Sequence, residues 1–429
     1  MNRKMLSAAI IIASAAFTFT SCSTSKKAMN DNNSQSARQG DGVAVMPAED
    51  MDPTYLIYSD SQREIVKKNN DFAFHLFQQL GGMDGKVVSP MSVAYLMGML
   101  ANGANGATQQ EILKAIGCEG VSVKELNELY QGMMQVAGKQ DKQTTVKIAN
   151  YIAVNKNNKI NADFAKTVGQ SYQAAIESLD FSSSKTTSRI NGWCSEHTDG
   201  MIPKIIDQVD AGAVSYLMNA IYFNGTWADK FDVHNTKLEN FRGFTRDIQK
   251  VDMMHQVKKF RYAENDTFKA VNLPYGNGSY SMTILLPNED QNIFDLVKSM
   301  DADKLSQLNR DMEQCIVTLK LPKFTTETSL PLNDLISKLG APLMFNPSLA
   351  DFTQFANGHF FVSKMLQKAK IEVSEQGTKA AAVTAAIMLT SAAPMEYRHV
   401  DFIANRPFVY MITDRQSGAI LFMGQYTGK

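Results

Sequence analysis

Few residues of this chain have the types and the spacing that a catalytic site requires. Cys194 and His197 lie three residues apart, so a thiol and an imidazole could share one helical face, but such neighbours often arise by chance. The GxSxG, HExxH and Walker motifs are absent, and residues 276–278 (GNG) lack the third glycine of a dinucleotide-binding loop and indicate a turn. The sequence therefore predicts a protein that is not an enzyme and uses no cofactor.

The cysteines of the body of the chain give no sign of a metal or disulfide site. Cys118, Cys194 and Cys315 are odd in number and contain no CxxC pair, so they predict neither a disulfide framework nor a zinc centre. At least one thiol must stay free in an exported protein. We expect all three to be buried structural thiols.

The fourth cysteine, Cys22, ends a segment that indicates lipid attachment. A basic start and an apolar run precede residues 19–22 (FTSC), which resemble the bacterial lipobox, in which the signal is cut before a cysteine that becomes lipid-modified. Residues 1–21 are thus predicted to be a lipoprotein signal peptide; a plain signal peptide is the alternative. Residues 22–55 then form a lipidated, flexible polar tether.

The expected location follows from this signal. An exported, lipid-anchored protein belongs in the bacterial cell envelope, held to a membrane through the lipid on Cys22 and facing the periplasm or the outer membrane. Residues 23–27 (STSKK) contain no acidic side chain of the kind that some lipoproteins use for surface display. The sequence therefore does not indicate which side of the membrane carries the protein. The chain carries 43 basic and 43 acidic residues, which gives no long-range field for nucleic acid.

A small-residue segment near the C-terminus is the most informative feature of the chain. From Thr378 onward, alternate residues through Thr390 are small or slender, and no proline occurs before Pro394. Because side chains alternate between the faces of a strand, such a segment could enter a crowded sheet as a central strand. An alanine-rich helix is the alternative, because alanine has the highest helix propensity. The helix explains neither Gly377 nor the threonines.

The rest of the chain must position this segment, and its pattern predicts an α+β fold with early helices and late strands. Predicted helices cover residues 62–80, 93–102 and 108–116, with Thr108 and Glu111 as a capping box. Predicted strands cover residues 87–88, 145–154, 214–223, 279–286, 315–321, 408–412 and 420–423.

Motifs spread over this body resemble those of the serpin family. They are residues 70–74 (NDFAF), 88–92 (VSPMS), 219–227 (NAIYFNGTW), 273–275 (LPY), 321–324 (LPKF), 402–408 (FIANRPF) and 422–424 (FMG). Each motif is weak alone, but their order and spacing are specific. The resemblance implies one domain over 56–429, with three β-sheets, about nine helices and an exposed reactive-centre loop at about 375–395.

The resemblance also implies a mechanism, since serpin loop insertion is an established switching transition. A protease attacks the loop and forms an acyl-enzyme, and the cut loop enters the largest sheet as a new strand. The hinge that enters first corresponds to Glu375, Gly377, Thr378, Ala380, Ala381 and Ala382. Because these residues include no bulky or charged side chain at the entry point Thr378, we predict a suicide inhibitor. A non-inhibitory, membrane-tethered scaffold is the alternative.

Family spacing places the reactive bond thirteen residues after Thr378, at Ser391–Ala392. Met388, Leu389 and Thr390 are alternatives, because the segment that follows is longer than usual. Small or apolar residues at this point predict elastase-, subtilisin- or chymotrypsin-like serine proteases as partners, and papain-like cysteine proteases as a further class. We expect the inhibitor to be a monomer.

Further residues correspond to the family's polar groups around the largest sheet. Lys323 and Glu375 match a pair at the top of the sheet, and Trp227 matches the family's buried tryptophan. Beneath the sheet, the matching polar residues are Ser89, Ser92, Asn219 and Gln367. Gln367 stands where many relatives have histidine, so we expect a rewired network without the usual pH sensitivity.

Overall fold

The computed structural model describes residues 55–358, 360–378 and 396–428, and it confirms the α+β class. Among these residues, the α-helices are α1 (Asp60–Leu80), α2 (Pro90–Gly103), α3 (Gly106–Ala115), α4 (Val123–Val136), α5 (Ala162–Tyr172), α6 (Lys185–His197), α7 (Ile293–Ser299), α8 (Ala302–Asp311) and α9 (Asn333–Lys338). In this part of the chain no helix is long and apolar enough to cross a lipid bilayer.

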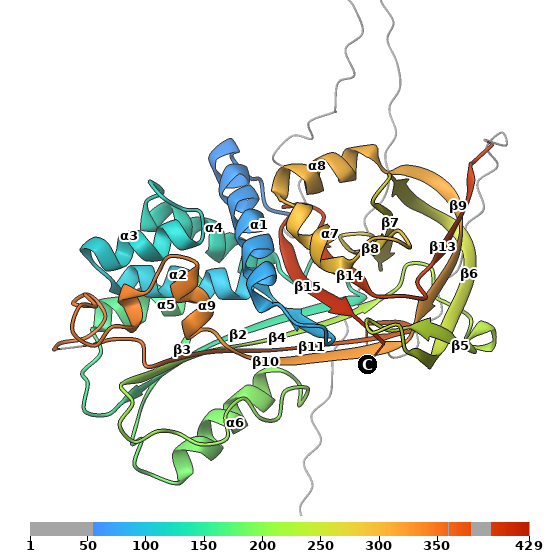
Figure 1. Cartoon of the computed structure of the whole chain (residues 1–429). Coiled ribbons are helices and arrows are strands. Elements are labelled where there is room, and N and C mark those ends of the chain that lie inside the picture. Colours follow the sequence, from blue (N-terminus) through green and yellow to red (C-terminus); the bar gives the residue numbers. More distant parts are fainter. Residues whose placement is uncertain (1–54, 359, 379–395, 429) are drawn as a thin grey trace, which may run out of the picture. The chain divides into compact units, whose positions relative to one another are not determined.

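Six strands form the sheet that matters most here, in the order β10-β11-β12-β4-β2-β3. Their bounds are β2 (Thr144–Asn155), β3 (Ala175–Leu179), β4 (Ser215–Thr226), β10 (Phe324–Pro331), β11 (Lys364–Ser374) and β12 (Gly377–Thr378). Every residue of β4 except Asn224 is buried, as its apolar run predicted. Figure 1 shows α6 on one face of this sheet, with α1, α2 and α9 on the other.

The remaining strands form one hydrogen-bonded network instead of the two further sheets that the resemblance implies. Their bounds are β1 (Lys86–Val88), β5 (Lys237–Arg242), β6 (Ile248–Glu264), β7 (Phe268–Tyr275), β8 (Tyr280–Pro287), β9 (Glu313–Pro322), β13 (His399–Ile403), β14 (Phe408–Asp414) and β15 (Ile420–Tyr426). The long strand β6 pairs with β9 on one side, and with β5 and then β7 on the other. Strand β6 therefore connects β5, β7 and β9 within one network.

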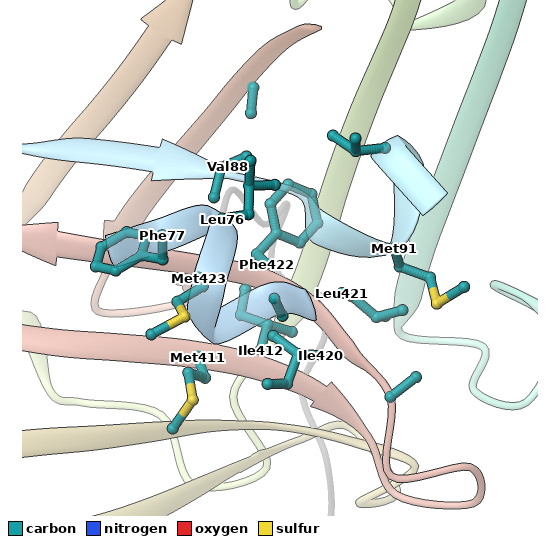
Figure 2. Packing of buried hydrophobic residues seen from close by; sticks show 14 of the residues in the cluster. Leu76, Phe77, Val88, Met91, Met411, Ile412, Ile420, Leu421, Phe422 and Met423 are labelled. Carbon is teal, nitrogen blue, oxygen red and sulfur yellow. The ribbon is translucent and has the colours of Figure 1, made fainter. Parts of the chain in front are cut away.

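Two hydrophobic layers cover the faces of the six-stranded sheet. Figure 2 shows Leu76 and Phe77 of α1 beside Phe422 and Met423 of β15 in the larger core. On the opposite face, Trp193 of α6 and its neighbours pack against the sheet in a separate cluster. All of these elements belong to one compact unit, Asp52–Lys429.

The predicted capping box of the third helix is wrong. The helix α3 begins at Gly106, and its N-cap residue is Asn105. Thr108 lies inside the helix, and its hydroxyl accepts a hydrogen bond from the Asp351 amide at 3.0 Å. The carboxylate of Glu111 accepts one from the Leu343 amide at 2.9 Å. Both side chains thus bind a distant segment instead of their own helix end.

Candidate functional site

The start of the small-residue segment already lies within the six-stranded sheet. Gly377 and Thr378 form β12, which pairs antiparallel with the end of β11 on one side and with the end of β4 on the other. Thr378 faces Val373 in β11 and Gly225 in β4. The described part of the segment therefore occupies the position of a central strand.

Beyond β12, strands β4 and β11 pair directly with each other. Residues Lys364–Lys370 of β11 lie parallel to Tyr216–Tyr222 of β4, and we call this paired stretch the seam. Parallel pairing is slightly less stable per residue than antiparallel pairing. A strand that continued from β12 would have to separate the seam, and it would replace one parallel ladder by two antiparallel ladders.

Thr378 is held in a polar pocket inside the core. Its side chain is fully buried, and its Oγ1 lies 2.8 Å from the phenolic oxygen of Tyr275. The Tyr275 ring stacks on Trp227, with ring centroids 4.3 Å apart and an interplanar angle of 11°. A small hydroxyl side chain satisfies this site, whereas a long or charged side chain has no space or partner there.

Gly377 is required at its position because of both its backbone angle and its close contacts. Its φ is 138°, a region that residues with a side chain rarely adopt. A Cβ atom on Gly377 would lie 2.1 Å from the carbonyl oxygen of Gly225. The glycine thus allows the chain to turn into the sheet close to the backbone of β4.

Glu375 anchors the turn between β11 and β12. Its buried carboxylate lies 3.2 Å from the Lys323 ammonium, and it accepts a hydrogen bond from the Thr236 hydroxyl at 2.8 Å. Trp227 fixes the same turn, because its indole N–H donates to the Ser374 carbonyl at 2.9 Å. The structure thus brings Trp227 together with Lys323 and Glu375, the pair that the resemblance placed at the top of the sheet.

We expect this anchor to weaken in acid. Burial alone would raise the pKa of Glu375, but hydrogen bonds from its own backbone, Thr236 and Lys323 together lower the pKa below its ordinary value. A lowered pKa stabilises the fold above the unfolded-state pKa, and this contribution is lost as the pH falls through the folded-state value. Trp227 fluorescence should therefore change between about pH 5 and pH 3. Glu375→Gln should remove that transition; an unchanged titration in this variant would contradict the assignment.

A second polar group lies beneath the middle of the sheet. Gln367 makes two hydrogen bonds with the backbone of Ser89: its side-chain oxygen accepts from the N–H at 2.9 Å, and its side-chain nitrogen donates to the C=O at 2.8 Å. The Ser89 hydroxyl donates to the Ser92 hydroxyl at 3.1 Å. These three residues form one buried network that contains no group titrating near neutral pH.

Asn219 faces Gln367 across the seam but bonds elsewhere. Its side-chain nitrogen donates to the oxygen of Asn150 at 3.0 Å, and Asn150 in turn donates to the Tyr172 carbonyl at 2.9 Å. The predicted polar group is therefore divided into two networks on neighbouring strands. Asn150 was not predicted, because nothing in its local sequence distinguishes it.

A second anchor holds the chain at Tyr397 and Arg398, shortly after the small-residue segment. The Lys259 ammonium lies 3.7 Å from the centre of the Tyr397 ring. Arg398 lies 3.4 Å from the Glu264 carboxylate and 3.3 Å from that of Glu313. Strand β13 follows at His399. The sequence did not predict this second anchor.

Several predicted site residues lie outside the described part of the chain. They are Ala380, Ala381 and Ala382 of the hinge, the bonds between Met388, Leu389, Thr390, Ser391 and Ala392, and the lipidation residue Cys22. Their assignments stay predictions.

The cysteine–histidine pair has no activated nucleophile. Burial raises the pKa of Cys194 to about 12, so the thiol stays protonated. The His197 ring stacks on Trp193 at 4.1 Å, and its Nδ1 lies 2.8 Å from the Trp193 carbonyl oxygen. Cys118, Cys194 and Cys315 are all free and buried, as predicted.

Comparisons with known proteins agree on one family. Residues 67–428 match the model of the serpin family, described as serine protease inhibitor. Leukocyte elastase inhibitor of Sus scrofa is 32% identical, over 84% of this chain and 98% of the relative. Plasminogen activator inhibitor 1 of Bos taurus is 33% identical, over 83% and 90% respectively. The native-state structure of the thermophilic serpin tengpin superposes with a TM-score of 0.78 at 28% identity, covering 87% and 95%.

Proposed function

We propose that this chain, which belongs to the serpin family, inhibits endopeptidases by covalent trapping. The inhibitors among its relatives support protease inhibition in general. One observation supports the mechanism: β12 occupies the top of the gap between β4 and β11, and the parallel seam continues in line with it. The segment that follows Thr378 can extend β12 only by separating that seam.

The proposed reaction begins as ordinary proteolysis. The protease nucleophile attacks the carbonyl carbon of Ser391, an acyl-enzyme forms, and Ala392 leaves with a free amino group. The new end at Ser391 is no longer joined to the anchor at Tyr397 and Arg398, so the segment can extend β12. A strand of about 14 residues spans roughly 45 Å, so the attached protease is carried away from its docking position and its active site is distorted before the ester is hydrolysed.

Target choice is also part of the proposal. The small and apolar residues at 388–392 fit elastase-, subtilisin- and chymotrypsin-like serine proteases, with papain-like cysteine proteases as a further class. Leukocyte elastase inhibitor, a relative named for its target, supports the first of these classes. Trypsin-like proteases, which prefer basic residues, fit least.

A gel experiment tests the trapping mechanism. The purified protein is mixed with pancreatic elastase, chymotrypsin, trypsin, subtilisin or papain, boiled in detergent and separated by mass. We expect a band at the summed mass with at least one non-tryptic protease, and mass spectrometry of the released peptide should begin at Ala392. The same protease with its nucleophile replaced by alanine is the control and should give no such band. If every protease only cuts the chain and stays active, the scaffold alternative takes the place of inhibition.

We also propose that the inhibitor is a monomer tethered to the bacterial cell envelope through lipid on Cys22. The lipobox-like sequence before Cys22 and the polar residues after it support this location. Expressed in a bacterium, the chain should fractionate with membranes and incorporate labelled fatty acid. Cys22→Ser should abolish the label; a label that persists would contradict the assignment.

A further inference from the structure

A second site candidate lies away from the hinge and the seam. A cavity of about 490 Å³ lies between the turn that joins β5 to β6, the end of β8 and the connection from β13 to β14. Its lining includes three arginines, Arg242, Arg246 and Arg406, and two acidic residues, Glu289 and Asp290. This volume falls in the usual range for small-molecule sites, about 300–1,000 Å³.

The two carboxylates that line the cavity form no ion pair with its three guanidinium groups. Across the described residues, neither Arg242, Arg246 nor Arg406 forms an ion pair with a carboxylate. Arg406 is only partly exposed; its Nε donates to the Pro287 carbonyl at 2.9 Å, and one terminal nitrogen donates to the Asn405 side chain at 3.2 Å. These two bonds fix the orientation of the guanidinium, and its other terminal nitrogen has no acceptor among the described residues.

Charges of both signs act on Arg406. Burial lowers the pKa of Arg406; Glu289 opposes this effect, and Arg242 adds to it by like-charge repulsion. Glu289 and Asp290 are exposed to solvent, so water screens their negative charge more than it screens the partly buried arginine. An anion in the cavity would relieve the repulsion between the arginines.

We infer that this cavity binds a small oxyanion that carries phosphate or sulfate groups. Arginine presents a planar fork of donors that matches the oxygens of such groups. Three guanidinium groups from two segments of the chain can donate hydrogen bonds to more oxygens than the two oxygens of a single carboxylate. A tetrahedral phosphate or sulfate offers that further oxygen. The inference uses no residue of the proposed inhibitory mechanism and stands independently of it.

Calorimetric titration of the purified protein with pyrophosphate, phosphate, sulfate and citrate tests the site. The double variant Arg242→Gln/Arg246→Gln removes two exposed side chains that form no hydrogen bond or ion pair with the described residues, so it should fold normally. We expect saturable binding of pyrophosphate, weakened about tenfold or more in the double variant. Lys250→Gln is the matched control, because Lys250 is exposed on the neighbouring strand β6 but does not line the cavity. It should bind within about twofold of the wild type.

A further variant tests whether a negative charge in the lining weakens anion binding. Glu289→Gln removes a negative charge from the lining and should tighten pyrophosphate binding about threefold or more. Absence of saturable heat up to about 10 mM pyrophosphate in the wild type would overturn the site. Equal affinity in the wild type, the double variant and the Lys250 control would overturn it as well. Citrate binding more tightly than pyrophosphate would overturn the choice of phosphate or sulfate as the ligand group.

Discussion

Replacing Thr378 by arginine should convert the inhibitor into an ordinary substrate. Thr378 is fully buried between β4 and β11, where its hydroxyl lies beside the phenol of Tyr275, whose ring stacks on Trp227. An arginine there would bury a charge without a partner, which costs several kcal/mol. If about 3 kcal/mol of this cost falls on the insertion barrier, insertion slows roughly 100-fold, and the acyl-enzyme is hydrolysed first.

The stoichiometry of inhibition measures this competition directly. The number of inhibitor molecules consumed per protease inactivated should rise by about tenfold or more in Thr378→Arg, while the rate of loop cleavage stays close to that of the wild type. Thr378→Ser keeps the hydroxyl beside Tyr275 and should behave as the wild type. Efficient trapping by Thr378→Arg would mean that residue 378 does not lead insertion.

Cleavage within residues 379–395 should raise the thermal stability of the protein strongly. The released segment would replace the parallel seam of Lys364–Lys370 and Tyr216–Tyr222 by antiparallel ladders on both sides of a new strand. With about 1 kcal/mol net per hydrogen bond, a strand of about 14 residues stabilises the fold by on the order of 10 kcal/mol. We therefore expect the melting temperature to rise by about 20 °C or more.

Thermal unfolding of the intact and cut protein, followed by circular dichroism, checks this prediction. The cut form is made with a protease that cleaves the loop without being trapped. Protein cut only in the tether, residues 22–55, is the control and should melt with the intact protein. Equal melting temperatures for the intact and loop-cut forms would show that the segment does not enter the sheet.

The helices and strands that the sequence predicted are present because their patterns are local, whereas α4 to α9 were not predicted. The continuous apolar run at 214–223 predicted β4, which is buried along nearly its whole length. The capping-box prediction at Thr108 and Glu111 failed for a physical reason. Tertiary partners, the amides of Asp351 and Leu343, take both side chains, and the helix begins two residues earlier. A four-residue pattern contains no information about such distant partners.

In the candidate site, the sequence motifs likewise located individual residues but not all of their contact partners. The motif resemblance located Lys323, Glu375 and Gln367, and the structure places the first two in contact. It did not identify Tyr275 as the partner of Thr378, although residues 273–275 were part of a recognised motif. Nor did it identify Thr236 at Glu375. These contacts join segments more than a hundred residues apart, and a single sequence does not specify which side chains will meet.

The most direct test of the account asks whether β4 and β11 must separate. Tyr222 and Lys370 are paired in the parallel ladder of the seam, and neighbouring strands are close enough for a disulfide. The double variant Tyr222→Cys/Lys370→Cys can be assayed for the boiled covalent complex with a trapped protease, oxidised and then reduced. The account predicts that the oxidised protein is cut without trapping and that reduction restores the complex. Equal trapping in both states would contradict insertion between these strands.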